Sequence, residues 1–459
     1  MRYLFLLTVI GSLAAGGCGS SAEAEAEAIG DLARSWETTN AELHDELTRI
    51  QAEGGTPELL NESDVPSNDN VAVELLGLFT DHKLSAIRER ADNLFPAKRF
   101  AFNPVQLSQA VAFRMRYEKQ LKTARAALER PLCDFGIQFM AGHLAEMEFV
   151  DTVHLCANLE AFQAADALFG EKPQPDDAVK AFWNMLRLAT CLGAEKHPVA
   201  RLEAAYVRTK AFAVIQAIVK HEKVGQEHLE LLEQIVRTEL ESWPDDADAW
   251  IGERALGLHA YEMVRRGLAR ELLLEEDVAR FHKEGILADF SETAKQNVDQ
   301  DELFYVQAMR KIIEDCGQPY YLRKEIEEMR ADMHSRRSTS AFPLVASRLL
   351  LLDVPEAQVT IAQDRANWEA WALALSLATG RPTPDYKINP LTGRPYYAQE
   401  YHSDDGRLDV YDGGDTPQTL FVQAKGKRAE IAVRDFSLDE PGDAPTWIVV
   451  PFDLEARQP

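Results

Sequence analysis

Basic residues are scarce in this sequence. Lysine and arginine together number 49, against 75 aspartates and glutamates, and the formal net charge of the 459-residue chain is −26. Proteins that bind nucleic acid need a concentration of cationic side chains to neutralise phosphate groups. No such concentration is visible along the chain, so we expect no nucleic-acid partner.

The short motifs that identify common enzyme classes are missing as well. The sequence has no Gly-x-Ser-x-Gly elbow, no phosphate-binding loop, no dinucleotide fingerprint and no His-Glu-x-x-His pair. No nucleophile and base can therefore be named from the sequence. A hydrolase stays an alternative because catalytic triads are assembled in space and need no local motif.

Long apolar runs are also absent, apart from one short stretch at the N-terminus. A transmembrane helix needs about 20 apolar residues, whereas residues 3–17 are fewer and end in glycine. Arg2 precedes this stretch and small residues close it, which is the order found in secretory signal peptides. We therefore predict that residues 1–17 are a signal peptide and take no part in the fold.

The end of this stretch, Ala15-Gly16-Gly17-Cys18, resembles the lipobox of bacterial lipoproteins. In those proteins the cysteine is diacylated, exposed by cleavage and then acylated on its new amino group. Ala15 departs from the pattern, because leucine is commoner at that position. The resemblance implies that Cys18 anchors the chain to a membrane of the cell envelope, facing the periplasm or the exterior. Residues 18–30, rich in alternating alanine and glutamate, are then a spacer. The alternative is plain secretion.

Cysteine is rare in the rest of the chain. The remaining residues are Cys133, Cys156, Cys191 and Cys316, without a Cys-x-x-Cys pair, which argues against a zinc ribbon or a thioredoxin-like motif. Four cysteines allow three disulfide pairings, and an exported protein can hold disulfides. Cys156 and Cys191 lie in apolar helical segments, where buried unpaired thiols are the simpler expectation. The disulfide state stays open.

Helical periodicity is abundant. The composition, 46% hydrophobic and 27% charged, is ordinary for a globular protein, and the chain is long enough for a sizeable core and several folding units. We predict a mainly α fold, an irregular array of helices over residues 31–379. The expected helices cover residues 31–53, 66–79, 82–94, 104–130, 144–169, 178–192, 199–219, 227–240, 247–270, 275–285, 299–316, 320–334, 344–352 and 354–379.

Two of these segments have features of their own. Residues 199–219 carry apolar side chains almost all round, which predicts a buried central helix. Asp176 and Asp177 precede the segment 178–192 and are expected to cap it.

The pattern changes at Gly380, where proline, glycine and aspartate become frequent. Residues 419–424, 429–436 and 446–452 are short β-rich runs, and the first two flank a Lys-Gly-Lys-Arg turn that predicts a hairpin. We therefore predict a small β-rich subdomain over residues 380–459. Three short strands are marginal alone, so we expect this tail to dock on Trp368 and Trp371 of the last helix. Its available aromatic residues are Tyr396, Tyr397, Tyr401, Tyr411, Phe421 and Trp447.

Four landmarks carry a family resemblance. They are Glu129-Arg130-Pro131-Leu132-Cys133-Asp134-Phe135-Gly136, Leu186-Arg187-Leu188-Ala189, Gly252-Glu253-Arg254-Ala255 and, in the tail, Asn389-Pro390-Leu391-Thr392-Gly393-Arg394-Pro395-Tyr396. The body resembles a family of large helical envelope proteins of unknown function, and the tail resembles the end of a type II secretion pseudopilin. The family has no established active site, so the resemblance implies no catalytic residue. A lipobox in place of a prepilin motif implies that the chain is not a pilus subunit.

Five aspartates in the tail are candidate calcium ligands, as the pseudopilin resemblance also implies. They are Asp404, Asp405, Asp409, Asp412 and Asp415. Clustered carboxylates on a glycine-rich loop suit calcium, which takes six to eight oxygen ligands. The alternative is ordinary turn chemistry, because aspartate and glycine both tolerate unusual backbone angles.

A second candidate site combines two histidines with two carboxylates. On one continuous helix, His143 and His154 would lie within about 20° of each other, flanked by Glu146 and Asp151. Such a set could bind a transition metal. The alternative is a pair of hydrogen-bonded histidines on a mostly buried face.

Together these features predict a lipid-anchored envelope protein that binds other proteins through a broad helical surface. We expect no cofactor other than calcium. The alternative is an envelope hydrolase with its site between the helical body and the tail.

Overall fold

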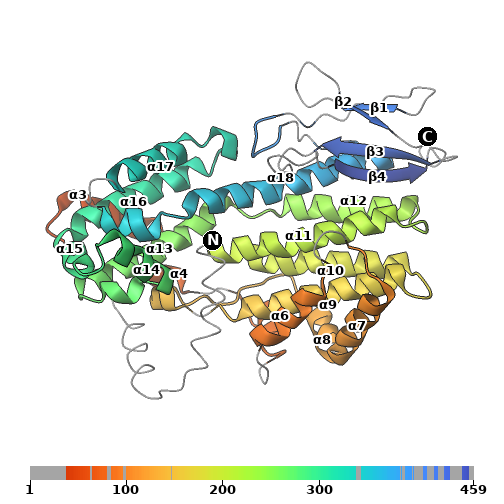
Figure 1. The fold of residues 1–459 in the computed structure, drawn as a ribbon, viewed down its shortest axis with the longest axis horizontal. Helices are drawn as coiled ribbons and strands as arrows, with labels where there is room; N and C mark the ends of the chain where they lie inside the picture. The colour runs from red at the N-terminus through yellow and green to blue at the C-terminus, as the bar shows by residue number, and fades with distance from the viewer. Residues whose placement is uncertain are drawn as a thin grey trace.

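The computed structural model describes residues 38–62, 65–79, 84–96, 100–145, 147–337 and 343–382 (Figure 1). In the tail it describes residues 384, 388–394 and 396 and four strands. The predicted signal peptide, Cys18 and the predicted spacer lie outside the described residues.

The described part of the chain is predominantly α-helical, which confirms the predicted mainly α character. The longest helices are α9 (Phe149–Phe169), α10 (Pro175–Gly193), α11 (Pro198–Lys220), α12 (Gln226–Glu241), α13 (Asp246–Arg265), α16 (Val298–Asp315) and α18 (Val354–Thr379). The shorter ones are α3 (Ala41–Ala52), α4 (Pro57–Leu60), α5 (Val71–Leu76), α6 (Leu84–Leu94), α7 (Pro104–Arg116), α8 (Glu118–Ala127), α14 (Glu275–Glu284), α15 (Phe290–Gln296) and α17 (Lys324–Arg337). None of these described helices is long and apolar enough to cross a bilayer.

Local signals explain several helix ends. Pro175 and Pro198 occupy the first turns of α10 and α11, where a missing N–H costs nothing. Asp176 and Asp177 lie inside the first turn of α10, so the prediction that they precede and cap it is wrong. The helix begins earlier because proline favours its first position. Gly380 ends α18 in a left-handed conformation (φ 71°) that glycine adopts without strain.

Figure 1 shows α18 running along much of the molecule. Towards its C-terminal end it packs with α11 and α12, and α9, α10 and α11 pack on one another beside them. The other end is built around α13 and α16, with α3 and α17 against α16. The large side chains Trp250, Tyr261, Tyr305, Phe281 and Phe290 fill the core there.

A glycine sets the approach of α13 to the connection between α10 and α11. A Cβ atom at Gly252 would lie 1.6 Å from the carbonyl oxygen of Lys196. No side chain fits in that space, so glycine is required for this close contact.

Tertiary packing shortened or divided several predicted helices. The segment 104–130 is two helices that meet at Tyr117, whose backbone (φ −111°, ψ 21°) is not helical. Its ring packs against Phe79 and Phe113, with centroids 6.0 Å and 5.2 Å away. The segment 344–352 contains a π-helical turn, η4 (Ala346–Leu350). The remaining one-turn elements are the 3₁₀ helices η1 (Phe139–Leu144), η2 (Ala269–Leu272) and η3 (Tyr320–Leu322).

Helix α11 is central, as predicted, but its buried surface is not purely apolar. It packs against α9, α10, α13 and α18. Its buried residues include four charged ones, Arg201, Glu203, Arg208 and Lys210. Tyr206, which the apolar pattern placed inside, is 43% exposed. The polar residues are tolerated inside because the neighbouring helices supply partners for them.

The tail contains β1 (Arg407–Val410), β2 (Gln418–Phe421), β3 (Arg428–Arg434) and β4 (Trp447–Asp453). β1 pairs with β2 and β3 pairs with β4, both antiparallel. The prediction of a hairpin between the runs at 419–424 and 429–436 is therefore wrong. Ile448 and Val450 alternate on β4 and are both buried, so the demand for burial outweighs the local turn signal.

The tail lies on α18, as predicted (Figure 1). Of the aromatic residues expected to make the contact, Tyr396 takes part, together with two aliphatic residues of β4. Ile448, Val450 and Tyr396 share one hydrophobic core with Trp368 and Trp371. The Tyr396 hydroxyl also donates a hydrogen bond to the carbonyl oxygen of Ala366, at 3.0 Å. Among the aromatic residues proposed for docking, Phe421 and Trp447 lie in strands, and Tyr397, Tyr401 and Tyr411 lie outside the described residues.

Candidate functional site

The two motifs that carried sequence-based site predictions fall largely outside the described residues. Cys18 does, and so do four of the five candidate calcium ligands, Asp404, Asp405, Asp412 and Asp415. Asp409 lies in strand β1. Lipidation and calcium binding therefore stay predictions.

The histidine site is not formed as predicted. His143 belongs to η1, which contains Gly142 in a left-handed conformation (φ 56°), and α9 begins only at Phe149. The two histidines therefore do not share one continuous helix, and the calculated angle between them does not apply. Glu146 lies outside the described residues. Among the described residues, no group of three or more histidine, cysteine, aspartate or glutamate side chains is placed to hold a metal ion.

Asp151 and His154 instead belong to a polar cluster between α6, α9 and α11. Arg88 Nη1 lies 2.7 Å from Asp151 Oδ1, and Arg88 Nη2 lies 3.8 Å from Glu203 Oε2. His154 Nε2 lies 2.6 Å from the same Glu203 oxygen. Complete burial lowers the pKa of His154, and the Glu203 carboxylate only partly opposes this. A buried histidine with polar neighbours is the alternative that the sequence left open.

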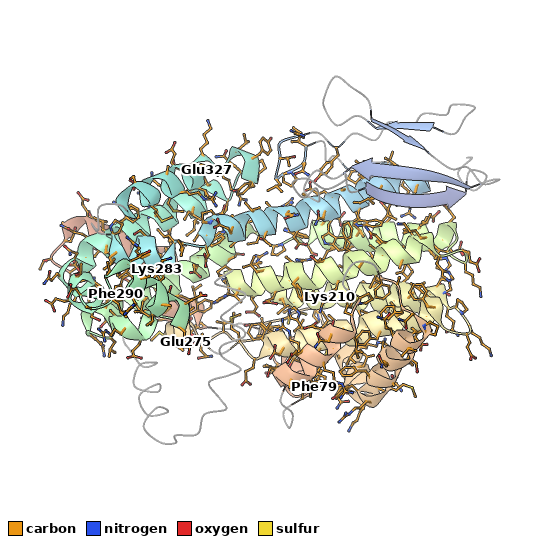
Figure 2. The ribbon with its side chains drawn as sticks, in the orientation of Figure 1. Phe79, Lys210, Glu275, Lys283, Phe290 and Glu327 are labelled. Carbon is orange, nitrogen blue, oxygen red and sulfur yellow. The ribbon has the colours of Figure 1, made fainter. Side chains whose placement is uncertain are left out.

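Lys210, labelled in Figure 2, is the buried cation of this cluster. Its Nζ lies 2.5 Å from Asp92 Oδ1 and 2.8 Å from Asn158 Oδ1, and Asn158 Nδ2 donates to the same Asp92 oxygen at 2.9 Å. Burial lowers the pKa of Lys210, which the Asp92 carboxylate only partly offsets. The exposed ring of Tyr206 covers the amine, with its centroid 4.7 Å from Nζ.

The geometry around Lys210 favours a structural role. A lysine that acts as a general base must reach a substrate proton, whereas this residue is only 5% exposed and its amine donates to two neighbours. The same contacts join three helices that are far apart in the sequence. We interpret the cluster as a cross-link between α6, α9 and α11.

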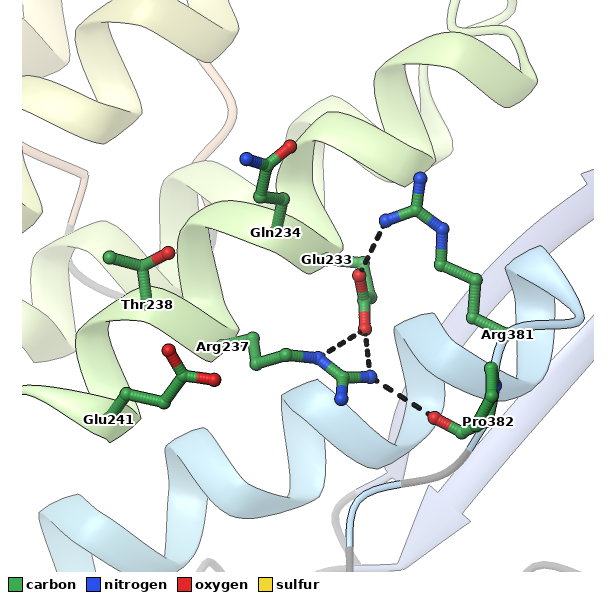
Figure 3. Close-up of a pocket in the computed structure, with 7 residues that line it drawn as sticks. All are labelled: Glu233, Gln234, Arg237, Thr238, Glu241, Arg381 and Pro382. Atoms are coloured by element: carbon green, nitrogen blue, oxygen red, sulfur yellow. Dashed lines mark hydrogen bonds and ion pairs between the residues drawn. The ribbon is translucent and has the colours of Figure 1, made fainter.

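A surface groove of about 430 Å³ lies where the helical body meets the tail (Figure 3). Five of its residues come from α12, and two follow the end of α18. They are Glu233, Gln234, Arg237, Thr238, Glu241, Arg381 and Pro382. The sequence predicted that any hydrolytic site would lie at this junction, but it identified none of these residues.

A buried carboxylate organises the groove. Glu233 Oε1 accepts hydrogen bonds from Arg237 Nε at 2.8 Å and from Arg237 Nη2, and Glu233 Oε2 accepts one from Arg381 Nη1 at 3.0 Å. Arg237 Nη2 also donates to the carbonyl oxygen of Pro382 at 3.1 Å. Figure 3 shows both guanidinium groups converging on Glu233. The hydrogen bonds to Glu233 fix the positions of both guanidinium groups, and both arginines line the groove.

The two arginines keep hydrogen-bonding capacity for a ligand. Their side chains are 34% and 41% exposed. Each guanidinium has five N–H donors in a planar fork, and Arg237 Nη1 and Arg381 Nε take no part in the contacts among the described residues. Two fixed, exposed guanidinium groups suit carboxylate or carbonyl oxygens. The groove can therefore bind a polar segment of another molecule.

The sequence contains only a weak signal for this groove. Polar residues recur every three or four positions along α12, at Glu230, Glu233, Arg237 and Glu241. Such a stripe ordinarily predicts a solvated face. The partner Arg381 is far away in the sequence, at the start of the predicted linker, so the convergence of the two arginines requires the tertiary structure.

A further buried carboxyl group lies just beyond α10. Glu195 Oε1 accepts a hydrogen bond from the backbone N–H of Phe135 at 2.8 Å. Burial raises the pKa of Glu195 to about 8, and the nearby Asp134 carboxylate adds to the effect. The Glu195 carboxyl group is therefore mostly protonated in the folded protein at neutral pH.

This pKa predicts a pH-dependent stability. The folded-state pKa of Glu195, about 8, lies above its ordinary value of 4.5, so the folded state binds the proton more tightly. The contribution to stability is complete below about pH 4.5 and is lost as the pH rises to about 8. Urea unfolding of the wild type and of Glu195→Gln across this range should show a larger loss of stability in the wild type than in the variant. Glutamine retains the acceptor for Phe135 and cannot ionise, so parallel pH profiles would contradict the assignment.

No protein-family model matches this chain, and comparison with curated proteins and with solved structures finds no match.

Proposed function

We propose that this chain is a lipid-anchored protein of the bacterial cell envelope that binds other proteins. The groove between α12 and Arg381 carries the proposal, because it presents two fixed guanidinium groups at the surface. Anchoring is supported by the N-terminal stretch that ends at Cys18. A protein partner suits the groove because backbone carbonyls and acidic side chains are abundant on protein surfaces.

The alternative of a hydrolase is less well supported at this groove. Ser376 Oγ donates a hydrogen bond to Glu233 Oε1 at 3.1 Å, which is the contact expected of a nucleophile and its base. Ser376 is fully buried, however, and both Glu233 oxygens already accept from arginines. Neither group can reach a substrate in the groove without a rearrangement.

We further propose that residues 380–459 form a small β-rich unit on α18, and that its aspartates bind calcium. The two strand pairs and the buried residues of β4 support the first part. The clustering of Asp404, Asp405, Asp409, Asp412 and Asp415 supports the second.

Site-specific photo-crosslinking tests the groove. A photoreactive residue at Gln234 or Thr238, both exposed in the groove, should capture the same discrete protein partner in envelope membranes. The same residue at the exposed Lys119, on α8 and outside the groove, is the matched control and should capture none. Adding Arg381→Ala should reduce the captured amount about tenfold, because a hydrogen bond to a charged group is lost. Identical products from Lys119 would contradict the proposal.

Lipidation has a separate test. Cys18→Ser should abolish labelling by a fatty-acid analogue and release the protein from membranes, because one side chain carries the anchor. Membrane fractionation with and without high salt measures the release. Retention of an unlabelled protein in the membrane fraction would count against the lipoprotein assignment without affecting the groove.

A further inference from the structure

Arg187 on α10 and Glu195, just beyond its end, both contact the segment that follows α8. Arg187 Nη2 donates hydrogen bonds to the carbonyl oxygens of Leu128 and Arg130, at 3.2 Å and 3.0 Å. Eight residues further on, Glu195 accepts from the N–H of Phe135. Cys191 follows Arg187 by four residues and therefore shares its helix face. It also lies midway in the sequence between Arg187 and Glu195, whose contacts flank Cys133 on the segment, so Cys191 lies opposite the middle of the segment.

The two thiols meet there. The side chain of Cys133 lies within interaction range of that of Cys191, and both thiols are unpaired in the structure. Cys191 is buried in the hydrophobic core against which Cys133 packs. The far side of the segment is held as well, because Val71 N donates to the carbonyl oxygen of Leu132 at 2.8 Å and Asp134 N donates to Asn70 Oδ1 at 3.0 Å. Fixed backbone on both sides of Cys133 keeps the two thiols together.

We propose that Cys133 and Cys191 form a disulfide, and that Cys156 and Cys316 stay reduced. Cys156 lies fully buried within α9, and Cys316 packs in a different core, where its thiol donates to the carbonyl oxygen of Ile312. Of the three pairings that four cysteines allow, the contacts favour only a bond between Cys133 and Cys191. The bond joins the segment between α8 and η1 to the end of α10.

The reaction requires an external disulfide as oxidant. Cys133 is the more exposed thiol, and its thiolate attacks the oxidant, which releases one reduced thiol and leaves a mixed disulfide on Cys133. Cys191 then attacks the Cys133 sulfur and releases the second thiol. The two protein thiols lose two electrons and two protons, and the external disulfide gains them.

The surroundings make this exchange slow in the folded protein. The interaction with the Cys191 thiol and burial both raise the pKa of the Cys133 thiol, and the nearby carboxyl groups of Glu195 and Asp134 act in the same direction. The thiolate is the reactive form, so oxidation should accelerate as the pH rises.

The test uses the purified full chain in its reduced form. The protein is incubated with oxidised glutathione at about pH 8.5, where more thiolate is present, then denatured and alkylated. The digest uses chymotrypsin, since residues 134–155 contain no lysine or arginine and trypsin would leave Cys133 and Cys156 on one peptide. Mass spectrometry without reductant should find a peptide pair that joins Cys133 to Cys191, with Cys156 and Cys316 alkylated.

Two variants sharpen the result. Cys191→Ser should leave Cys133 as a stable mixed disulfide with glutathione, whereas the matched control Cys156→Ser should still form the link. The melting temperature of the oxidised wild type should exceed that of the reduced protein by about 5 °C. A bond to Cys156 or Cys316, or recovery of Cys133 and Cys191 only as separate peptides, would overturn the proposal.

Discussion

Deletion of residues 386–459 is expected to destabilise the helical body by about 5 kcal/mol. The deletion removes Tyr396, Ile448 and Val450 from the core that they share with Trp368 and Trp371. Burial of one large apolar side chain contributes about 1.5–3 kcal/mol, and sums of such values are upper limits because unfolded chains are partly compact. Urea unfolding of the truncated and intact proteins, followed by tryptophan fluorescence, measures the difference.

Two control variants distinguish the effect of lost packing on stability from the effect of a shorter chain. Truncation after Asp453 retains every described strand and should change the stability little. Ile448→Ala in the full chain should lose about 2–4 kcal/mol, because it leaves a cavity beside α18. If the protein lacking residues 386–459 unfolded at the same urea concentration as the intact chain, the tail would be an independent module.

Removal of the Arg208 side chain is the other change with a large expected effect. Arg208, on α11, lies 2.9 Å from Glu239 of α12 and 2.9 Å from Asp364 of α18. Thr190 of α10 donates to Glu239 at 2.7 Å, so four helices meet in one network. The ring of Trp243 stacks over the guanidinium, with its centroid 4.3 Å away.

Arg208→Ala should cost about 3–5 kcal/mol, because both carboxylates would be left buried without a cation. Burial already raises the pKa of Asp364 to about 6 in the presence of Arg208, which shows how poorly the site tolerates its charge. The matched control is the exposed pair Arg330–Glu356, where Arg330→Ala should cost about 1 kcal/mol or less. Chemical denaturation of the two variants against the wild type gives both values. Equal losses would show that burial does not distinguish the two arginines.

Local patterns in the sequence were sufficient for most helices. The segment 354–379 was predicted with both of its ends, because Pro355 fits the first turn and Gly380 can adopt the left-handed conformation that stops a helix. Helices α11, α12 and α16 lie within one residue of their predicted ends for the same kind of reason. A helix is stabilised by contacts three and four residues apart, so its sequence contains the necessary information.

Predictions that combined two segments were less successful. The helix expected over 144–169 begins at Phe149, since Gly142 (φ 56°) and Ala145 (ψ 121°) are not helical. The predicted histidine site depended on one continuous helix and is therefore not formed. The hairpin near residue 425 was wrong because β3 pairs with β4. Strand pairing is decided by which faces become buried, and no local signal reports this.

By itself, the sequence determined that the chain is mainly helical, where most helices begin and end, and that Trp368 and Trp371 receive the tail. These properties depend on the spacing of apolar residues and on proline and glycine, which act over a few positions. Only the tertiary structure decided which charges meet. Lys210 contacts Asp92, Glu233 contacts Arg381, and Cys133 lies beside Cys191. The members of each pair are far apart in the sequence, so the periodicity of one helix does not predict these contacts. A buried polar group requires a partner but does not specify one, so the choice belongs to the packing of the helices.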